Sequence, residues 1–205
     1  MKEKFILKQE QLFNTAAALF AEKGYHGTSI NDLAQAMGLQ KGSLYHYFKS
    51  KEELLFMLLD EYISAALLEI EKICALNVDA VEKLRLFMLF YSSFYAGDRD
   101  RLVLLINDID KLSEALRLKI IEKERRYTKA LTDIFSQLQA AGIMKKIPPA
   151  VAAFAFFGMV HYTCKWFQQD GPVSAEALGE MFLEIFTNGV FVNPVTGGDV
   201  NAGEN

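Results

Sequence analysis

The glycine at position 38 separates two short helical patterns within residues 27–54. Before it, apolar residues recur at the spacing that gives a helix one apolar face, at Ile30, Leu33, Ala34 and Met37. Glycine adopts the left-handed conformation that ends a helix, so we expect the chain to turn at Gly38. After it, Leu44 and Phe48 are four residues apart and predict a second helix over residues 41–48 with both side chains facing inward. The segment therefore predicts two short helices joined by a tight turn, a helix-turn-helix.

Candidate capping residues mark where these helices begin. Thr28 is a candidate N-cap of the first helix, because its hydroxyl can accept a bond from an unpaired backbone N–H. Ser50 and Glu53 have the spacing of a capping box that opens a long helix, and Lys51 stands at its positive end. The outward residues of the second helix are small, basic or aromatic: Lys41, Ser43, Tyr45, His46 and Tyr47. Such a helix, projected by a turn, is typical of one that enters a DNA groove, whereas a solvated surface would explain any one of these residues alone.

The same segment resembles the DNA-binding domain of the TetR family of bacterial transcriptional regulators. The residues that carry the resemblance are Phe20, Gly24, Tyr25, Thr28, Ile30, Ala34, Gly38, residues 41–48 and residues 51–54. It implies that double-stranded DNA is the partner, with phosphate contacts from Thr28, Tyr47 and Lys51. It also implies base-edge contacts from Gln40, Lys41, Gly42, Ser43 and His46, with Tyr45 near the DNA backbone. Gln40 departs from the family pattern, which often has Ser or Thr as the cap, so we expect its side chain to be free for DNA.

The charge distribution fits DNA binding at one end of the molecule. Residues 1–51 contain seven Lys and four acidic residues, which leaves the remainder at −7 in a chain of net charge −4. No apolar run reaches the roughly 18 residues of a membrane span, and the N-terminal apolar residues have helical spacing instead of forming a signal peptide. We therefore expect a cytoplasmic protein without a membrane partner. Cys74 and Cys164 match no metal or redox spacing, so we expect reduced thiols, no metal and no cofactor.

The whole chain predicts an all-α fold of about nine helices. Strand-like alternation flanked by turn residues is absent from the sequence. We expect an N-terminal three-helix helix-turn-helix domain over residues 1–49, a helical ligand-binding and dimerisation domain over 50–191, and a disordered tail over 192–205. Besides the two short helices, we expect helices over 5–23, 50–75, 80–96, 99–109, 113–141, 149–169 and 175–189, with Asp79 capping one of them.

The last two of these helices have more apolar surface than one small body can cover. One contains Phe154, Phe157, Gly158, His161, Tyr162, Lys165 and Trp166, and the other contains Leu178, Met181, Phe182, Ile185, Phe186 and Gly189. We expect them to pair with their symmetry mates in a homodimer, although burial in the protein's own core is the alternative. A dimer would set two recognition helices about 34 Å apart on a pseudo-palindromic operator.

The middle of the chain is rich in aromatic residues, which fits either a filled core or an apolar ligand cavity. The family resemblance implies a small-molecule effector. The C-terminal half also resembles, more weakly, a subgroup that senses acyl-CoA thioesters, on residues 125–127, Leu138, residues 141–142, 158–159, Tyr162, Trp166 and residues 170–171. That resemblance implies an acyl tail among Phe87, Tyr91, Phe94, Phe157, His161 and Trp166, and phosphates at Arg125 and Arg126. The alternative for the two arginines is a solvated face paired with Glu122 and Glu124.

Enzymatic chemistry finds no support in the sequence. Of the histidines, His26 and His46 fall in the DNA-binding segment and His161 stands alone among aromatic residues. A nucleophile–histidine set, a zinc-protease motif and a phosphate-binding glycine loop are all missing from the sequence, so we expect no catalytic residues. Two alternatives to the acyl-CoA effector stay open: a regulator of drug efflux, and a DNA-binding protein that acts through a protein partner without a small-molecule inducer.

Overall fold

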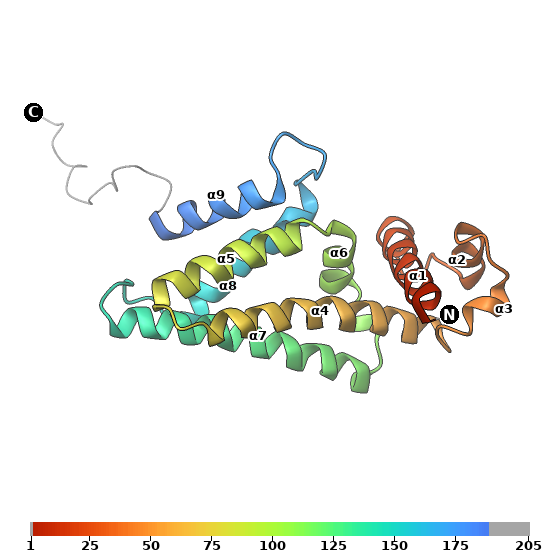
Figure 1. Ribbon diagram of the computed structural model, residues 1–205, viewed down its shortest axis with the longest axis horizontal. Helices are drawn as coiled ribbons and strands as arrows, with labels where there is room; N and C mark the ends of the chain where they lie inside the picture. The colour runs from red at the N-terminus through yellow and green to blue at the C-terminus, as the bar shows by residue number, and fades with distance from the viewer. Residues whose placement is uncertain (1, 189–205) are drawn as a thin grey trace, which may run out of the picture.

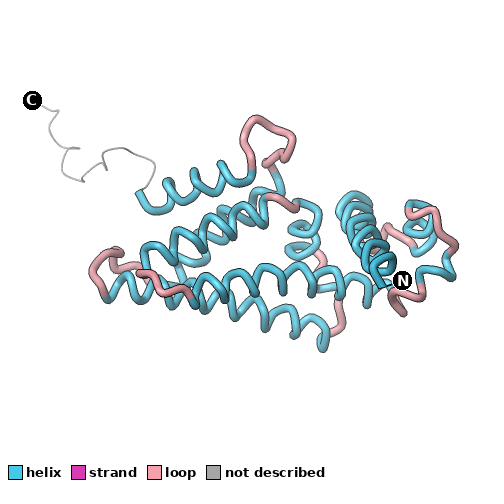
Figure 2. Tube along the Cα trace, in the orientation of Figure 1, coloured by secondary structure: helices cyan, strands magenta, loops and turns pink. Residues whose placement is uncertain are grey.

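The computed structural model describes residues 2–188, and the side chains of residues 7–188. This part of the chain is built from α-helices and two short 3-10 helices without strands, as Figure 2 shows. The helices are α1 (Lys2–Lys23), α2 (Ile30–Ala36), α3 (Lys41–Leu44), α4 (Lys51–Ala75), α5 (Ala80–Ala96), α6 (Arg99–Asn107), η1 (Ile109–Lys111), α7 (Glu114–Ala140), α8 (Pro149–His161), η2 (Tyr162–Lys165) and α9 (Ala175–Asn188). The predicted all-α fold is confirmed. The predicted tail 192–205, the domain end at 191 and Gly189 lie outside the described residues.

The helices form a head and an elongated body (Figure 1). The head consists of α1, α2 and α3 and lies at one end of the long axis. Helix α4 begins beneath the head and continues into the body, where α5 and α7 pack against it, α8 packs against α5 and α7, and α9 covers α5. One continuous apolar core extends from Leu12 of α1 to Phe182 of α9. The body is therefore attached to the head through α4 and its neighbours.

Several predicted helix boundaries are confirmed by their caps. The Ser50 Oγ accepts the backbone N–H of Glu53 at 3.0 Å, and an Asp79 carboxylate oxygen accepts the N–H of Glu82 at 2.8 Å. Gly38 has a φ of 62°, the left-handed conformation that the turn after α2 requires. The predicted capping box at α4 is offset by one residue, because the Glu53 carboxylate accepts the N–H of Lys49 and not that of Ser50.

The prediction that Thr28 caps α2 is wrong. Ser29 is the N-cap: its Oγ accepts the N–H of Asp32 at 3.1 Å, and the Asp32 carboxylate accepts the N–H of Ser29 at 2.7 Å. Thr28 is fully buried, and its hydroxyl lies 3.1 Å from the carbonyl oxygens of both Leu19 and Gly24. Its hydroxyl therefore stabilises the end of α1.

Two predicted helices are shorter than expected. α3 ends at Leu44, and residues 45–47 form a turn that still buries Phe48. Aromatic residues have a lower helix propensity than Ala or Lys, and the cap at Ser50 already begins the next helix. α8 ends at His161 instead of near residue 169, and the chain continues as η2. There the buried Thr163 donates its hydroxyl to the Val160 carbonyl at 2.7 Å, a local bond that competes with regular helix.

Polar contacts tie the head to α4 and α6 of the body, and tie α4 to the start of α7. The Lys51 ammonium of α4 donates to the carbonyl oxygens of Tyr25 and Thr28, at 2.8 Å and 3.0 Å, and lies 4.3 Å from the centre of the Tyr25 ring. The Arg101 guanidinium of α6 donates to the side-chain oxygen of Asn14 in α1 at 2.8 Å. At the same junction, the Glu52 carboxylate of α4 accepts the N–H of Ser113, the residue before α7, at 2.7 Å.

We expect Lys51→Met to lower the free energy of unfolding by about 1–3 kcal/mol, because two charge-assisted hydrogen bonds are lost while the length of the side chain is kept. Urea denaturation followed by circular dichroism measures this. The control is Lys49→Met, since Lys49 is exposed and its ammonium has no bond within the described residues. Unchanged unfolding together with weaker binding to every DNA sequence would instead assign Lys51 to phosphate contact.

Candidate functional site

The residues predicted to contact DNA bases lie on and beside α3, at the outer end of the head (Figure 1). Gln40, Lys41, Gly42, Tyr45 and His46 are exposed, and Ser43 and Tyr47 are half-buried. Gln40 occupies the N-cap position of α3 without a side-chain capping bond, so its amide is free to bind elsewhere. The surface thus presents hydrogen-bond donors, acceptors and aromatic rings on one short projecting segment.

Two predicted phosphate contacts, Thr28 and Lys51, are occupied inside the protein. The Thr28 hydroxyl is buried and bonded to backbone carbonyls, and two N–H groups of the Lys51 ammonium serve the carbonyls of Tyr25 and Thr28. A phosphate contact by the Thr28 side chain conflicts with its burial. Lys51 has one donor left for a phosphate. The structure therefore gives both residues a clear role in holding the head together.

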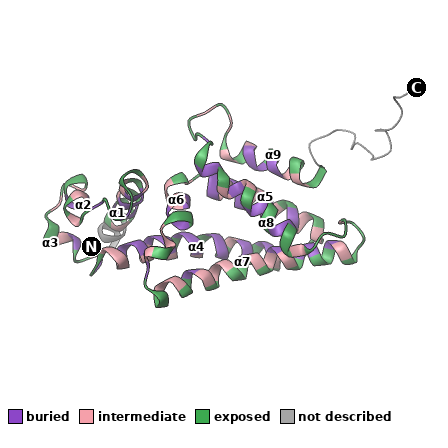
Figure 3. Ribbon diagram, turned by 180° about the vertical axis from the view of Figure 1, so that it is seen from behind, coloured by how far each residue is buried: buried purple, intermediate pink, exposed green. Residues whose placement is uncertain are grey.

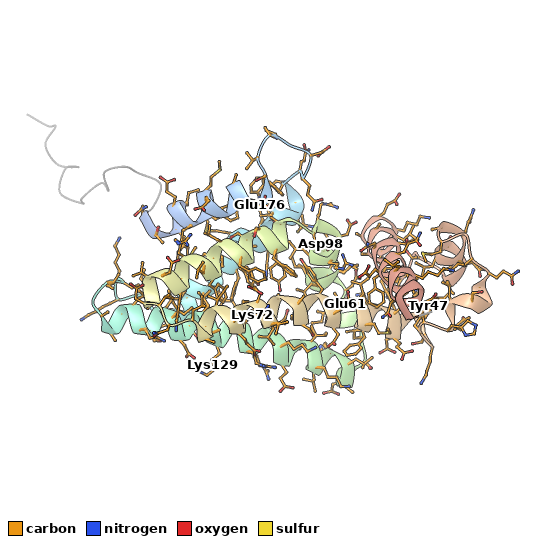
Figure 4. All side chains as sticks on the ribbon, viewed as in Figure 1. Tyr47, Glu61, Lys72, Asp98, Lys129 and Glu176 are labelled. Atoms are coloured by element: carbon orange, nitrogen blue, oxygen red, sulfur yellow. The ribbon has the colours of Figure 1, made fainter. Side chains whose placement is uncertain are left out.

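Most residues predicted to bind the effector meet around Tyr91 in the body. The Tyr91 ring lies 5.7 Å from Phe87 and 4.9 Å from Phe157, centre to centre, and its hydroxyl lies 2.9 Å from His161 Nε2. Phe94 contacts Tyr95 edge-on at 5.3 Å and belongs to the same aromatic cluster. Side chains fill the space between α4, α5 and α7 (Figure 4). The rings pack as a filled core in this state.

The three other predicted effector residues lie outside this cluster. Arg125 and Arg126 are exposed on α7, and the Arg126 guanidinium pairs with Glu71. Trp166 is 52% exposed and contacts Phe167 and Phe182 edge-on, away from Tyr91. The tertiary structure therefore separates the predicted residues into an interior aromatic group and a surface group.

Three tyrosines outside the predicted set of effector-binding residues belong to the interior group. Tyr62 of α4 stacks on Phe94 at 4.8 Å, Tyr95 of α5 lies 4.3 Å from Tyr91, and Tyr127 of α7 lies 5.6 Å from Tyr91. All three are buried. The sequence signal was the choice of tyrosine over phenylalanine at core spacing, since a buried hydroxyl needs a partner.

Burial controls the ionisation of this interior group. It lowers the pKa of His161 to about 4, so the imidazole is neutral near pH 7 and its bare nitrogen can accept the Tyr91 hydroxyl. Burial also raises the pKa of Glu124 on α7. Burial and, to a smaller extent, the nearby Glu124 carboxyl raise the pKa of Tyr127. The group therefore offers neutral hydrogen-bonding partners and no fixed positive charge.

Two open depressions lie on the body surface. One of about 340 Å³ is lined by Arg126, Lys83, Lys129, Glu71 and Asp133 among others, and Figure 4 shows Lys129 on the outer side of α7. Another of about 440 Å³ lies where α5 meets α6, around Asp98, Arg99 and Gln168. Of the predicted effector residues, Arg126 lines the first depression, where its charge is already paired.

Exposed apolar residues lie along α8 and η2 and on α9. They are Val151, Phe154, Gly158, Tyr162, Trp166, Met181 and Ile185. Phe154 is 64% exposed, whereas Leu178 and Phe182 of α9 are buried in the protein's own core. Figure 3 shows the resulting alternation of buried and exposed residues on α8 and α9. Part of the predicted dimer surface is therefore buried in the protein's own core, and the rest is exposed on the surface.

The part of the chain that the structure describes gives no support for a disulfide, a metal site or a membrane-spanning helix. Cys74 and Cys164 are unpaired thiols, and no group of three acidic, histidine or cysteine side chains within residues 7–188 could hold a metal ion. Among the described helices, none combines the length and apolar character needed to cross a membrane.

Known proteins have the same division into a head and a body. Residues 12–58 match the family model described as bacterial regulatory proteins, tetR family, and residues 77–190 match a tetracyclin repressor-like C-terminal domain. The chain is 27% identical to the HTH-type transcriptional repressor KstR2 of Mycolicibacterium smegmatis, over 89% of this chain and 90% of that protein. It is 28% identical to the fatty acid metabolism regulator protein of Bacillus subtilis, over 89% of this chain and 95% of that protein.

Solved structures have the same fold. The TetR family transcriptional regulator PfmR from Thermus thermophilus is 33% identical with a TM-score of 0.81, over 88% of this chain and 98% of that one. AibR in complex with isovaleryl coenzyme A and operator DNA is 27% identical with a TM-score of 0.78, over 90% of this chain and 100% of that one. Since family models match both the head and the body, this chain belongs to the TetR family of bacterial DNA-binding transcriptional regulators.

Proposed function

We propose that this protein is a homodimeric repressor that binds a pseudo-palindromic operator through α3 and leaves it when an acyl-CoA thioester binds the body. The observation that carries the operator-binding role is the set of exposed residues at the outer end of the head, namely Gln40, Lys41, Gly42, Tyr45 and His46. A short helix that projects from a turn can enter the major groove, where base edges present distinct donors and acceptors.

The exposed side chains fit base-edge chemistry. A lysine such as Lys41 donates to the O6 and N7 acceptors of guanine, and a glutamine such as Gln40 can bond both N6 and N7 of adenine. Gly42 lets the backbone approach closely, since a Cβ there would meet no protein atom within 4 Å. Tyr45 and His46 are placed to contact the sugar-phosphate backbone or a neighbouring base. These residues would therefore supply sequence preference, and surrounding lysines would supply general affinity.

The exposed apolar residues of α8, η2 and α9 support the homodimer. Patches of large exposed apolar residues are typical of an interaction surface. Val151, Phe154 and Gly158 of α8 and Tyr162 of η2 recur at helical spacing, and Gly158 has no side chain to hold a facing helix away. A twofold pairing there would present two heads to successive half-sites, about 34 Å apart on DNA.

The acyl-CoA effector is supported by the relatives and by the body. AibR is described in complex with isovaleryl coenzyme A, and a Bacillus subtilis relative is named a fatty acid metabolism regulator. In this chain the interior aromatic group offers an apolar environment for an acyl tail. The exposed Arg125 and Arg126 on α7 stand where phosphates could be bound by guanidinium groups.

The contacts between head and body provide a route for release. Entry of an acyl tail between α4, α5 and α7 would displace α4, and Lys51 and Glu52 couple α4 to the head and to the start of α7. A changed distance between the two heads of the dimer would break phosphate contacts, each of which contributes to affinity. By thermodynamic linkage, effector binding then lowers the affinity for the operator, and operator binding lowers the affinity for the effector by the same factor.

The filled interior favours a second candidate, a TetR-family regulator that responds to a protein partner without a small-molecule inducer. Tyr91, Phe87 and Tyr95 are fully buried against one another, and none of them lines either of the two surface depressions. Control of drug efflux is a third possibility, with an aromatic or cationic drug as effector. The effector experiment below separates the three.

We expect Lys41→Ala to weaken binding to the operator by about 10- to 100-fold while changing affinity for random DNA much less, because base contacts are lost only at the specific site. An operator can be selected from a random duplex library and binding measured by fluorescence anisotropy. Lys49→Ala is the matched control, since this exposed lysine is expected to weaken both kinds of DNA equally. Equal losses for Lys41→Ala would remove its base-contact role.

We expect Phe154→Asp to convert the dimer to a monomer at micromolar concentration, because the interface would bury an unpaired charge. Sedimentation velocity distinguishes the two species. Leu68→Asp on α4 is the control: Leu68 is 57% exposed but does not belong to the exposed apolar residues of α8, η2 and α9, so this variant is expected to stay dimeric. A wild-type protein that sediments as a monomer would contradict the proposal outright.

We expect acyl-CoA thioesters to raise the melting temperature of the protein and to release it from the selected operator at the same concentrations. Thermal shift and anisotropy, with free CoA as the control, test this across short, long and aromatic acyl groups. Stabilisation by drugs alone would favour efflux control. If no compound changes either readout, the result favours the partner-responsive candidate.

A further inference from the structure

Two buried tyrosine hydroxyls in the body lack a hydrogen-bond partner. The Tyr62 and Tyr95 side chains are 5% and 0% exposed, and neither hydroxyl makes a hydrogen bond within the described residues. Burial, and after it the nearby Tyr127 phenol, raise the pKa of Tyr95, and the Tyr91 phenol lowers it to a smaller extent. Neither phenol is placed so as to satisfy the geometry of a hydrogen bond to the Tyr95 hydroxyl. Natural proteins leave few such groups, because each costs stability that a hydrogen bond would restore. Phenylalanine would fill the same space without this cost.

The two hydroxyls belong to different helices that meet in the interior aromatic group. Tyr62 comes from α4 and Tyr95 from α5, and their ring centres lie 5.4 Å apart, edge to face. Phe94 stacks on Tyr62, and Tyr91 lies against Tyr95. A ligand oxygen that reached this point could accept from both phenols while its apolar part contacted the surrounding rings.

The surroundings favour an oxygen without charge. His161 is neutral and already bonded to Tyr91, and the carboxyl of Glu124 faces the group from α7. The cation nearest in effect to the Tyr62 phenol is Arg101, which lowers the pKa of that phenol by its charge. Its guanidinium already forms an ion pair with Asp98 and a hydrogen bond with Asn14. A carboxylate would lose its hydration here without gaining a free cation.

We propose that Tyr62 and Tyr95 bind an uncharged oxygen of the effector, a carbonyl or hydroxyl in its buried part, and that this site discriminates against the corresponding carboxylate. The inference rests on the proposed effector function and defines which chemical class of effector the interior accepts. Tyr62 also lies near the Arg101 contact that ties α6 to Asn14 of α1. Occupation of the site therefore acts close to a bond between body and head.

A third buried hydroxyl provides a matched control. Ser92 of α5 is fully buried and also lacks a hydrogen-bond partner. It faces α9, since a Cβ added at Gly179 would lie 3.5 Å from the Cβ of Ser92. The variant Ser92→Ala removes one unpaired buried hydroxyl on the side of α5 that faces α9. It therefore shows how the loss of such a hydroxyl changes stability when the proposed ligand contacts are kept.

The test uses the full-length wild-type protein and the variants Tyr62→Phe, Tyr95→Phe and Ser92→Ala. The probes are the uncharged N-acetylcysteamine thioesters of octanoic and phenylacetic acids, with the two free acids at pH 7.5 as the charged counterparts. Calorimetry gives the dissociation constants, and thermal unfolding gives the melting temperatures. The thioester probes lack the nucleotide of CoA, so they report on the interior alone.

We expect wild type to bind the thioesters at least ten-fold more tightly than the acids. Each Tyr→Phe variant is expected to unfold at the same or a higher temperature and to bind the thioesters about ten-fold more weakly. Ser92→Ala is expected to keep the wild-type affinity. Loss of affinity without loss of stability is the signature that a merely structural tyrosine would not produce.

Three results would overturn the inference: equal affinity in wild type and the Tyr→Phe variants, equal affinity for acids and thioesters, or no binding of either thioester to wild type. Operator release by acyl-CoA is measured separately. If acyl-CoA releases DNA and the Tyr→Phe variants bind the probes as wild type does, the proposed function stands and this site is wrong. If the probes bind as expected but acyl-CoA leaves the operator occupied, the site stands and the proposed effector is wrong.

Discussion

The Lys51 ammonium is the contact on which the arrangement of head and body depends. It donates to two backbone carbonyls in the loop after α1 and lies over the Tyr25 ring, so one side chain joins the start of α4 to the head. α4 itself is a rigid helix of 25 residues, about 38 Å long, whose other end packs in the body. α4 therefore connects the interior of the body to the loop that leads from α1 into α2 of the head.

The interior of the body combines tight packing with polar groups that packing alone does not require. Rings from α5, α7 and α8 surround Tyr91, and Tyr62 of α4 packs against Phe94 and Tyr95 beside it. Apolar residues alone could fill that volume. The phenols of Tyr62 and Tyr95 instead remain unpaired at a cost in stability. A regulator needs an interior that is less stable without its effector than with it, because only differential binding can shift the balance between conformations. Unpaired hydroxyls in the core supply such a difference.

Local patterns in the sequence were enough to predict the helices, the turn at Gly38 and the caps at Ser50 and Asp79, because these depend on residues close together in the chain. The same patterns failed where a tertiary contact decided the outcome. Thr28 has the chemistry of an N-cap, but its hydroxyl is used by carbonyls of α1, and Ser29 is the cap. α8 ends at His161, since Thr163 is buried and bonds to its own backbone.

By itself, the sequence determined the all-α class, the position of the recognition segment and the family, because helical periodicity, glycine turns and a dense local motif are properties of neighbouring residues. Only the tertiary structure decided which aromatic residues meet. It brought Tyr62 of α4 to Tyr95 of α5, placed Trp166 and the two α7 arginines outside that group, and buried part of the apolar stripe of α9. The physical reason is that periodicity defines the apolar face of a helix, whereas the partner of that face depends on how distant helices pack.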